Sequence, residues 1–317
     1  MEFVLKKIDL HLCRYKVAGH FIEVSQNIGE NFFADYMDNY IPFVEKIDDA
    51  DESLFSLAVE YCESFPEYTE ELVQDEEGQQ IICGSLQEKA VFDFRLQNKV
   101  AGILICAKDY KEANLLVPTG CSPYLLKFAV NNAIMVLFAI ASASYNTALF
   151  HAAVVSYKGK GYVFLGKSGT GKSTHARLWL KYNEGSELLN DDNPVVRIEK
   201  DENGKSLVRV YGSPWSGKTP CYKNEVYLLG GFVLLSQAPH NKIERLSGVR
   251  AYAALVPCIS GKRWESVIAD GLHKTENALA MNAPVWYLEC LPDEEAARVC
   301  REHVAMSYEE RNDEAIL

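Results

Sequence analysis

Short runs of alternating hydrophobic and polar residues fill the first third of the chain, and this pattern is typical of β-strands. The run FSLAVEYCESF (55–65) lies in an acidic stretch, and its periodicity fits a helix and a strand equally well. We therefore expect residues 1–120 to form a β-rich domain with an acidic, partly helical insertion. The clearest runs are LHLCRYKVAGHFIEV (10–24), KAVFDFRL (89–96), VAGILICA (100–107) and ANLLVP (113–118).

A long apolar segment follows the β-rich region. Ser122 and Pro123 resemble a helix start, with an N-cap residue before a proline at the first helical position. Residues 128–157 contain no Asp, Glu, Lys or Arg, but the longest purely apolar run, 133–141, has only nine residues. That is far below the roughly 20 residues that span a bilayer. We therefore expect residues 121–148 to form a buried connecting helix and not a membrane span.

The rest of the chain reads as a second domain of strands and helices over 149–305, with a polar tail at 306–317. Strands at 149–157 and 161–166 flank a tight turn at Lys158–Gly161, and a helix is expected at 173–182. Asn203-Gly204 predicts a type I′ hairpin turn, in which both central residues have positive φ. Further strand-like runs lie at 187–192, 194–199, 206–211, 227–236 and 283–290, before a helix that Pro292-Asp293 opens.

Charge and cysteine usage narrow the class of protein. The net charge is -12, and thirteen acidic residues stand between Glu45 and Glu77 against the single Lys46. Such a chain repels phosphate backbones, so a nucleic-acid partner is not expected; the acidic stretch is either a solvated face or a dock for a basic partner. The nine cysteines form no CxxC pair. This argues against a disulfide framework or zinc site and for a reducing compartment. With no signal-peptide pattern at the N-terminus, we expect a cytoplasmic protein without a membrane partner.

The most specific motif is GKSGTGKST at 166–174, a complete phosphate-binding loop (P-loop) between a predicted strand and a predicted helix. Glycines permit the backbone angles that turn successive N–H groups toward phosphate oxygens, and the helix N-terminus adds further donors. Lys172 is expected to reach the β- and γ-phosphates of ATP, and the Ser173 hydroxyl to bind Mg²⁺. The predicted nucleotide-binding residues are Gly166, Lys167, Ser168, Gly169, Thr170, Gly171, Lys172, Ser173 and Thr174.

Two acidic residues and a histidine complete the predicted catalytic set. Asp191 and Asp192 end a short apolar run, and adjacent carboxylates can supply both a metal ligand and an acceptor for a hydroxyl proton. Their alternative reading is a loop or capping pair. If the strands pair symmetrically about Lys158–Gly161, His151 faces Ser168 and lies beside the loop. We therefore predict His151, Lys172, Asp191 and Asp192 as catalytic residues, with Ser173, Asp191 and Asp192 as the metal-binding ones.

The segment GSPWSGK (212–218) follows a strand and is short, bounded by glycines and cationic. It fits a substrate or phosphate clamp with Trp215 and Lys218 as its contacts, and equally a structural turn with a packed tryptophan. Arg177, one turn along the predicted helix from Thr174, is expected to be an outer-face charge.

The run HAAVVSYKGKGYVFLGKSGTGKST (151–174) resembles the catalytic core of HPr kinase/phosphorylases, and it is also similar to ATP-dependent phosphoenolpyruvate carboxykinases. The resemblance covers roughly residues 149–300 and is carried by the loop, His151 and the pair Asp191-Asp192. It implies an α/β fold with an α+β tendency, in which a P-loop lies on a mostly antiparallel mixed sheet. It also implies that these side chains line a site for metal and γ-phosphate.

The chain departs from both families. HPr kinases carry Glu directly after the P-loop serine, where this chain has Thr174, as carboxykinases do. The shorter HPr-kinase-like proteins, often called serine kinases, match best. We therefore expect a Mg²⁺-ATP-dependent kinase acting on a hydroxyl, most simply serine, of a protein, peptide or small molecule that the sequence does not identify. The alternatives are a carboxykinase-like phosphotransferase and a non-catalytic ATP-binding regulator, and a homo-oligomer is left open.

Overall fold

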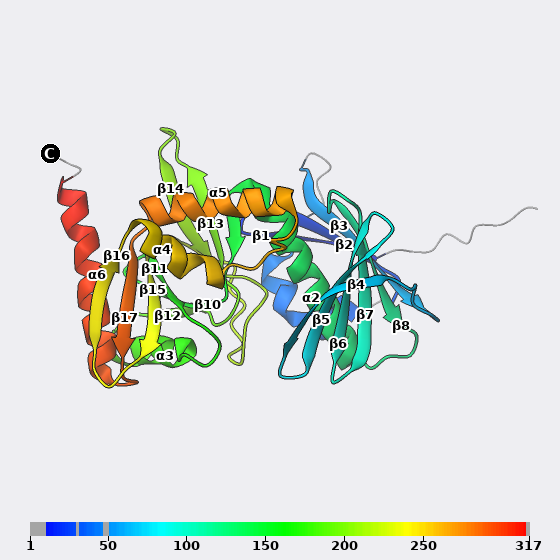
Figure 1. Cartoon of the computed structure of the whole chain (residues 1–317), viewed down its shortest axis with the longest axis horizontal. Helices are drawn as coiled ribbons and strands as arrows, with labels where there is room; N and C mark the ends of the chain where they lie inside the picture. The colour runs from blue at the N-terminus through cyan, green and yellow to red at the C-terminus, as the bar shows by residue number, and fades with distance from the viewer. Residues whose placement is uncertain (1–10, 30–31, 47–50, 315–317) are drawn as a thin grey trace, which may run out of the picture. The chain divides into compact units, whose positions relative to one another are not determined.

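The computed structural model describes residues 11–29, 32–46 and 51–314, and it divides into two compact units between Ala141 and Ser142. The division falls within the predicted connecting helix. The first unit is mainly β, as predicted from its alternating runs (Figure 1). Its elements are β1 (His11–Val17), β2 (His20–Gln26), α1 (Phe32–Tyr36), η1 (Asp38–Phe43), β3 (Ser53–Cys62), β4 (Thr69–Glu76), β5 (Gln79–Leu86), β6 (Lys89–Leu96), β7 (Lys99–Cys106), β8 (Glu112–Pro118) and α2 (Pro123–Ala141).

An eight-stranded sheet in the order β1-β2-β3-β8-β7-β6-β5-β4 organises this unit. The prediction of a partly helical acidic insertion is wrong for the residues described there, because β3 and β4 are both strands of this sheet. In β3, every second residue from Phe55 to Val59 is buried while Ser56 and Glu60 are exposed. The alternation shows that one face of β3 packs against a core, and the strand order places β3 between β2 and β8.

The helix α2 covers the inner face of this sheet, where it contacts β3, β6, β7 and β8. Ser122 caps it as predicted, since its Oγ accepts a hydrogen bond from the Leu125 N–H at 3.3 Å. The stretch Pro123–Tyr145 is long and apolar enough to cross a membrane by length and composition, and 56% of its most apolar window is buried in the structure. Packing against the sheet accounts for this hydropathy, in keeping with the predicted buried helix.

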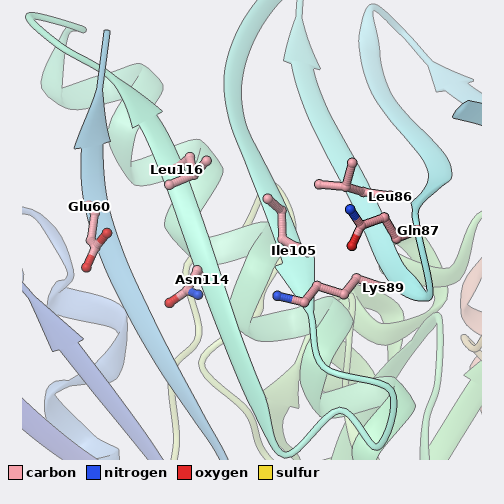
Figure 2. Close-up of a pocket in the computed structure, with 7 residues that line it drawn as sticks. All are labelled: Glu60, Leu86, Gln87, Lys89, Ile105, Asn114 and Leu116. Carbon is pink, nitrogen blue, oxygen red and sulfur yellow. The ribbon is translucent and has the colours of Figure 1, made fainter. Parts of the chain in front are cut away.

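The outer face of the sheet is crossed by the chain between β3 and β4. Tyr68 fastens this crossing, because its hydroxyl donates to the buried Asp93 carboxylate at 2.8 Å, which Arg95 also binds at 2.7 Å. The sheet also carries a shallow hollow of about 260 Å³ (Figure 2). Strands β3, β8, β7, β6 and the end of β5 supply its lining, which comprises Glu60, Leu86, Gln87, Lys89, Ile105, Asn114 and Leu116.

Strand β4 is the sheet's edge, and its only strand partner among the described residues is β5. All eight of its residues are exposed, including Leu72 and Val73. Acidic side chains stand at Glu70, Glu71 and Asp75 along the same strand.

The second unit carries the P-loop on a nine-stranded mixed sheet (Figure 1). Among the described strands, the pairings of β11 with β15 and of β15 with β17 are parallel, and the others are antiparallel. The predicted α/β class with a mostly antiparallel mixed sheet is thereby confirmed. The elements are η2 (Ser142–Tyr145), β9 (Thr147–Leu149), β10 (Ala152–Tyr157), β11 (Lys160–Leu165), α3 (Lys172–Tyr182), β12 (Glu187–Asn190), β13 (Val195–Lys200), β14 (Ser206–Tyr211), β15 (Val226–Gln237), β16 (Lys242–Leu246), α4 (Gly248–Leu255), η3 (Val256–Cys258), α5 (Ser266–Asn282), β17 (Val285–Cys290) and α6 (Glu294–Glu314).

Two hairpins differ from their predicted turns. The β10–β11 turn has only two residues, Lys158 and Gly159, with φ of 48° and 75°, so Tyr157 pairs with Lys160. The predicted register was wrong by two residues, and Ala152 faces Leu165. The β13–β14 loop spans residues 201–205, and Gly204 has positive φ but Asn203 does not. The Asp201 carboxylate makes the longer loop stable, because it accepts hydrogen bonds from the backbone N–H groups of Asn203 and Lys205.

The last helix also extends further than expected. Asp293 Oδ1 caps it by accepting the Ala296 N–H at 2.9 Å, as the Pro292-Asp293 signal predicted. The helix α6 continues to Glu314, into the segment predicted to be a polar tail, and residues 315–317 lie outside the described part of the chain.

The P-loop helix α3 is held on the sheet by an aromatic cluster around His175. The His175 ring is buried and lies edge-on to Phe164, and its Nε2 accepts a hydrogen bond from Trp179 Nε1 at 3.2 Å. Burial lowers the pKa of His175 to about 4 from an ordinary value of 6.5. The neutral imidazole is therefore part of the core that supports the loop.

This burial predicts a pH-dependent stability. Between pH 6.5 and 4 the unfolded chain binds a proton at His175 that the folded chain does not. The free energy of unfolding should therefore decrease as the pH is lowered through this range. The loss should approach about 3 kcal/mol. In His175→Gln, whose amide oxygen can still accept from Trp179, this part of the pH dependence should disappear. Urea unfolding of both proteins at several pH values is the measurement, and parallel pH curves would contradict the prediction.

Candidate active site

The phosphate loop lies between β11, which ends at Leu165, and α3, which begins at Lys172. Gly166, Gly169 and Gly171 all have positive φ, at 149°, 79° and 105°. A Cβ on Gly166 would lie 2.4 Å from Thr170 Oγ1, so both space and backbone angle demand glycine there. The loop is tied on its outer side, because Gln237 Nε2 at the end of β15 donates to the Gly169 carbonyl at 3.2 Å. Gln237 had no signal in the sequence, since only the parallel β11–β15 pairing brings it here.

The Lys172 side chain is buried at the base of this loop. Its ammonium donates to the Gly166 carbonyl at 2.9 Å and to the Lys167 carbonyl at 3.3 Å. Its third contact is with His151 Nε2 at 2.9 Å. The predicted catalytic residues Lys172 and His151 therefore lie in direct contact, although the register that led to His151 was off by two. A shift of two residues keeps a side chain on the same face of a strand, which is why the position survives the error.

His151 stands in the short break between β9 and β10. Its backbone N–H donates to the Cys258 carbonyl at 2.7 Å, which fixes the chain at this point. Its Nδ1 lies 3.2 Å from Asp192 Oδ1. The ammonium of Lys172 can only donate, so Nε2 carries the lone pair and Nδ1 carries the proton, which faces the Asp192 carboxylate. Asp192, His151 and Lys172 thus form one continuous chain of polar contacts.

The aspartate pair occupies the turn that follows β12. The Asp192 backbone N–H donates to Asn190 Oδ1 at 2.9 Å, and its Oδ2 accepts from Asn193 Nδ2 at 2.7 Å. Both Asp192 oxygens are therefore committed, one to His151 and one to Asn193. Asp191 is 6% exposed, and its Oδ2 accepts the Thr219 N–H at 3.3 Å. In the described part of the chain, Asp191 Oδ1 accepts no hydrogen bond.

The residue that joins this turn to the GSPWSGK segment is Asn190, which sequence reasoning missed. Its Nδ2 donates to Ser213 Oγ at 3.1 Å and to the Trp215 carbonyl at 3.0 Å. The segment therefore lies directly against the aspartates. Trp215 is 2% exposed and packs inside, whereas Lys218 is exposed. Of the two predicted clamp residues, only Lys218 has a side chain that a ligand could reach. The clamp stays a prediction.

Cys258 is a second residue that the sequence did not point to. Its buried thiol donates to the Ala254 carbonyl at 3.8 Å, and the Lys172 charge is near. Burial is the dominant effect and raises the pKa of Cys258, so the thiol is a packing group and not a nucleophile. All nine cysteines are free, and the expectation of no disulfide framework agrees with this.

The site fits a magnesium ion held largely by the nucleotide. Among the residues described, no three His, Cys, Asp or Glu side chains gather into a metal-binding group. Mg²⁺ in phosphoryl-transfer sites needs only one or two carboxylates besides phosphate oxygens and water. Asp191, with one oxygen uncommitted in a nearly buried site, fits that need, and Ser173 is the next residue after Lys172.

No protein-family model and no curated protein matches the chain. Among solved structures, the chain is similar to the Hpr(Ser) kinase/phosphatase from Coxiella burnetii, with 12% sequence identity and a TM-score of 0.29. The alignment covers 52% of this chain and 98% of that chain. The likeness is distant in sequence and partial in structure, so the function of this chain has to be inferred from its own site residues.

Proposed function

We propose that this chain is a Mg²⁺-ATP-dependent kinase that transfers the γ-phosphate to a hydroxyl, most simply that of a serine, on a protein, peptide or small molecule. The observation that carries the proposal is the single point at which the Lys172 ammonium contacts the phosphate loop and the His151–Asp192 pair. The phosphate loop and a histidine that can accept a proton lie in contact there. These are the two parts that phosphoryl transfer to a hydroxyl requires.

Lys172 and the loop amides would hold the β- and γ-phosphates. The ammonium now uses its donors on two carbonyls and on His151. A triphosphate offers charged acceptors, which make stronger hydrogen bonds than neutral ones. Nucleotide binding would therefore draw Lys172 away from His151 and toward phosphate.

His151 would accept the proton of the attacking hydroxyl. Release of Lys172 leaves the Nε2 lone pair without a hydrogen-bond donor, so it can accept a proton. Asp192 would keep the other proton on Nδ1 and stabilise the imidazolium that forms. The acceptor oxygen attacks the γ-phosphorus, its proton passes to Nε2, and ADP leaves. Asp192 would act through His151, because its Oδ1 faces His151 Nδ1 and its Oδ2 already accepts a hydrogen bond from Asn193.

Asp191 and Ser173 would hold the magnesium ion, whose role is to neutralise charge on the β- and γ-phosphates. This divides the aspartate pair, with Asp191 on the metal and Asp192 on the histidine. We place the reaction in the cytoplasm, since nine free cysteines suit a reducing compartment.

Transfer of the γ-phosphate from labelled ATP to serine-containing peptides and to proteins of a cell extract tests the proposal directly. Labelled acceptor together with ADP is the supporting result. Tight ATP binding without transfer to any acceptor would favour a nucleotide-binding regulator instead. Oxaloacetate-dependent turnover would favour a carboxykinase-like reaction.

Replacing Lys172 by Ala should weaken Mg²⁺-ATP binding roughly ten- to hundredfold, because it removes a charge-assisted contact worth about 1.5–3 kcal/mol. Lys181→Ala is the matched control, since Lys181 is an exposed cation at the far end of the same helix. Calorimetric titration of the three proteins is the measurement. Equal affinities would mean that the loop does not hold phosphate.

Variants of the two aspartates should differ in the Mg²⁺ concentration that nucleotide binding requires. Asp191→Asn should raise the Mg²⁺ concentration needed for nucleotide binding, by roughly tenfold on the scale of one charged contact. Asp192→Asn should leave that requirement unchanged and reduce transfer by about 10²-fold, the usual scale for loss of acid–base assistance. Titrations of Mg²⁺ with both variants decide the assignment, which fails if the two behave alike.

Replacing His151 by Ala should leave folding intact and ATP affinity within severalfold, while transfer falls by about 10²-fold or more. The exposed His240, which pairs with Glu289 at 3.4 Å, provides the control variant His240→Ala. Circular dichroism, nucleotide titration and a transfer assay on both variants form the test. A His151→Ala protein that transfers phosphate at the wild-type rate would remove the proton acceptor from the mechanism.

A further inference from the structure

Arg177 lies one helical turn beyond the phosphate loop, and its side chain folds back toward the loop. Its Nη2 lies 3.3 Å from Thr174 Oγ1, to which it donates a hydrogen bond. Side chains on a helix point toward the N-terminus, so a residue three positions on can reach the loop end in this way. The sequence pattern had suggested an outer-face charge with no role at the site.

The electrostatics of this helix end are unusual. The N-terminus of a helix carries a partial positive charge, and acidic side chains are preferred there. The first turn of α3 contains no acidic residue, and Lys172 and Arg177 place two cations within its first two turns. None of the ion pairs formed by the described residues involves Arg177. Two cations at the positive end of a helix repel it and each other, unless an anion binds between them.

The position of Arg177 favours contact with the α-phosphate of a bound nucleotide. Lys172 is buried at the base of the loop, where the β- and γ-phosphates would lie, and Arg177 is on the exposed side of the same helix end. A triphosphate that enters the loop with its γ-phosphate first keeps its α-phosphate toward the exposed side. The Thr174 hydroxyl accepts the Arg177 hydrogen bond and so has its own proton free to donate to a phosphate oxygen.

We propose that Arg177 binds the α-phosphate of the nucleotide and that Thr174 is the residue that orients its guanidinium. The inference rests on the proposed nucleotide-binding function, which it extends to a residue outside the loop motif. Arg177 would neutralise the α-phosphate, which ATP and ADP share. Lys172 would contact the β- and γ-phosphates, between which the bond breaks. Its effect should therefore appear equally in the binding of ATP and ADP.

The test is calorimetric titration with ATP, ADP and the two diastereomers of adenosine 5′-O-(1-thiotriphosphate), in which sulfur replaces one α-phosphate oxygen. Arg177→Ala should weaken ATP and ADP binding by the same factor, about tenfold for one charge-assisted bond. Wild-type protein should prefer one thio-diastereomer, and Arg177→Ala should lose that preference. Thr174→Val should show the same pattern with a smaller loss, and Arg177→Lys should recover part of the affinity but not the diastereomer preference.

Lys181→Ala is again the control, because it removes a cation from α3 without touching the helix start. Unchanged ATP and ADP affinities in Arg177→Ala would overturn the inference while leaving the kinase proposal intact. A loss confined to ATP would overturn it as well, since that result places Arg177 at the γ-phosphate. Failure of the wild-type protein to bind ATP at all would instead overturn the proposed function itself.

Discussion

The site depends on one buried ammonium group. Lys172 is almost excluded from water, and a buried charge is tolerated only when hydrogen-bond partners replace the lost solvent. It finds them in two adjacent loop carbonyls and in His151, which in turn faces Asp192. The phosphate loop, the break between β9 and β10, and the aspartate turn after β12 are thereby held in one arrangement. The same ammonium is the group proposed to bind the triphosphate, so nucleotide binding would redirect the contact that joins these segments.

Much of the second unit could be predicted because its signals are local. The phosphate loop is a contiguous motif whose glycines have a conformational reason, and the cap at Asp293 acts within one helical turn. The position of His151 beside the loop could be predicted by counting residues across one hairpin. That count missed the register by two, because a two-residue turn at Lys158-Gly159 is tighter than the sequence alone shows. The error changed the partner of His151 but not the face on which it lies.

Other features depend on contacts between distant segments, and the sequence carries no local mark of them. Asn190 joins the aspartate turn to the segment 212–218, and Gln237 reaches the loop from the end of β15. The acidic stretch was harder still, since its charges suggested a solvated insertion while its backbone contributes β3 and β4 to a sheet. Trp215 illustrates the same limit, because a tryptophan in a short loop can cover a ligand or fill a core, and here it is buried.

The acidic character of β4 has a consequence for the behaviour of many copies in one solution. An open edge strand offers unpaired N–H and C=O groups on which a second molecule could extend the sheet. Two copies meeting along this edge would bring Glu70, Glu71 and Asp75 against the same residues of their partner, and like charges facing each other across strands destabilise the pairing. The exposed Leu72 and Val73 would otherwise favour such contact. In the part of the chain that the structure describes, β4 is fully exposed, so electrostatic repulsion between these carboxylates would oppose the addition of a further strand.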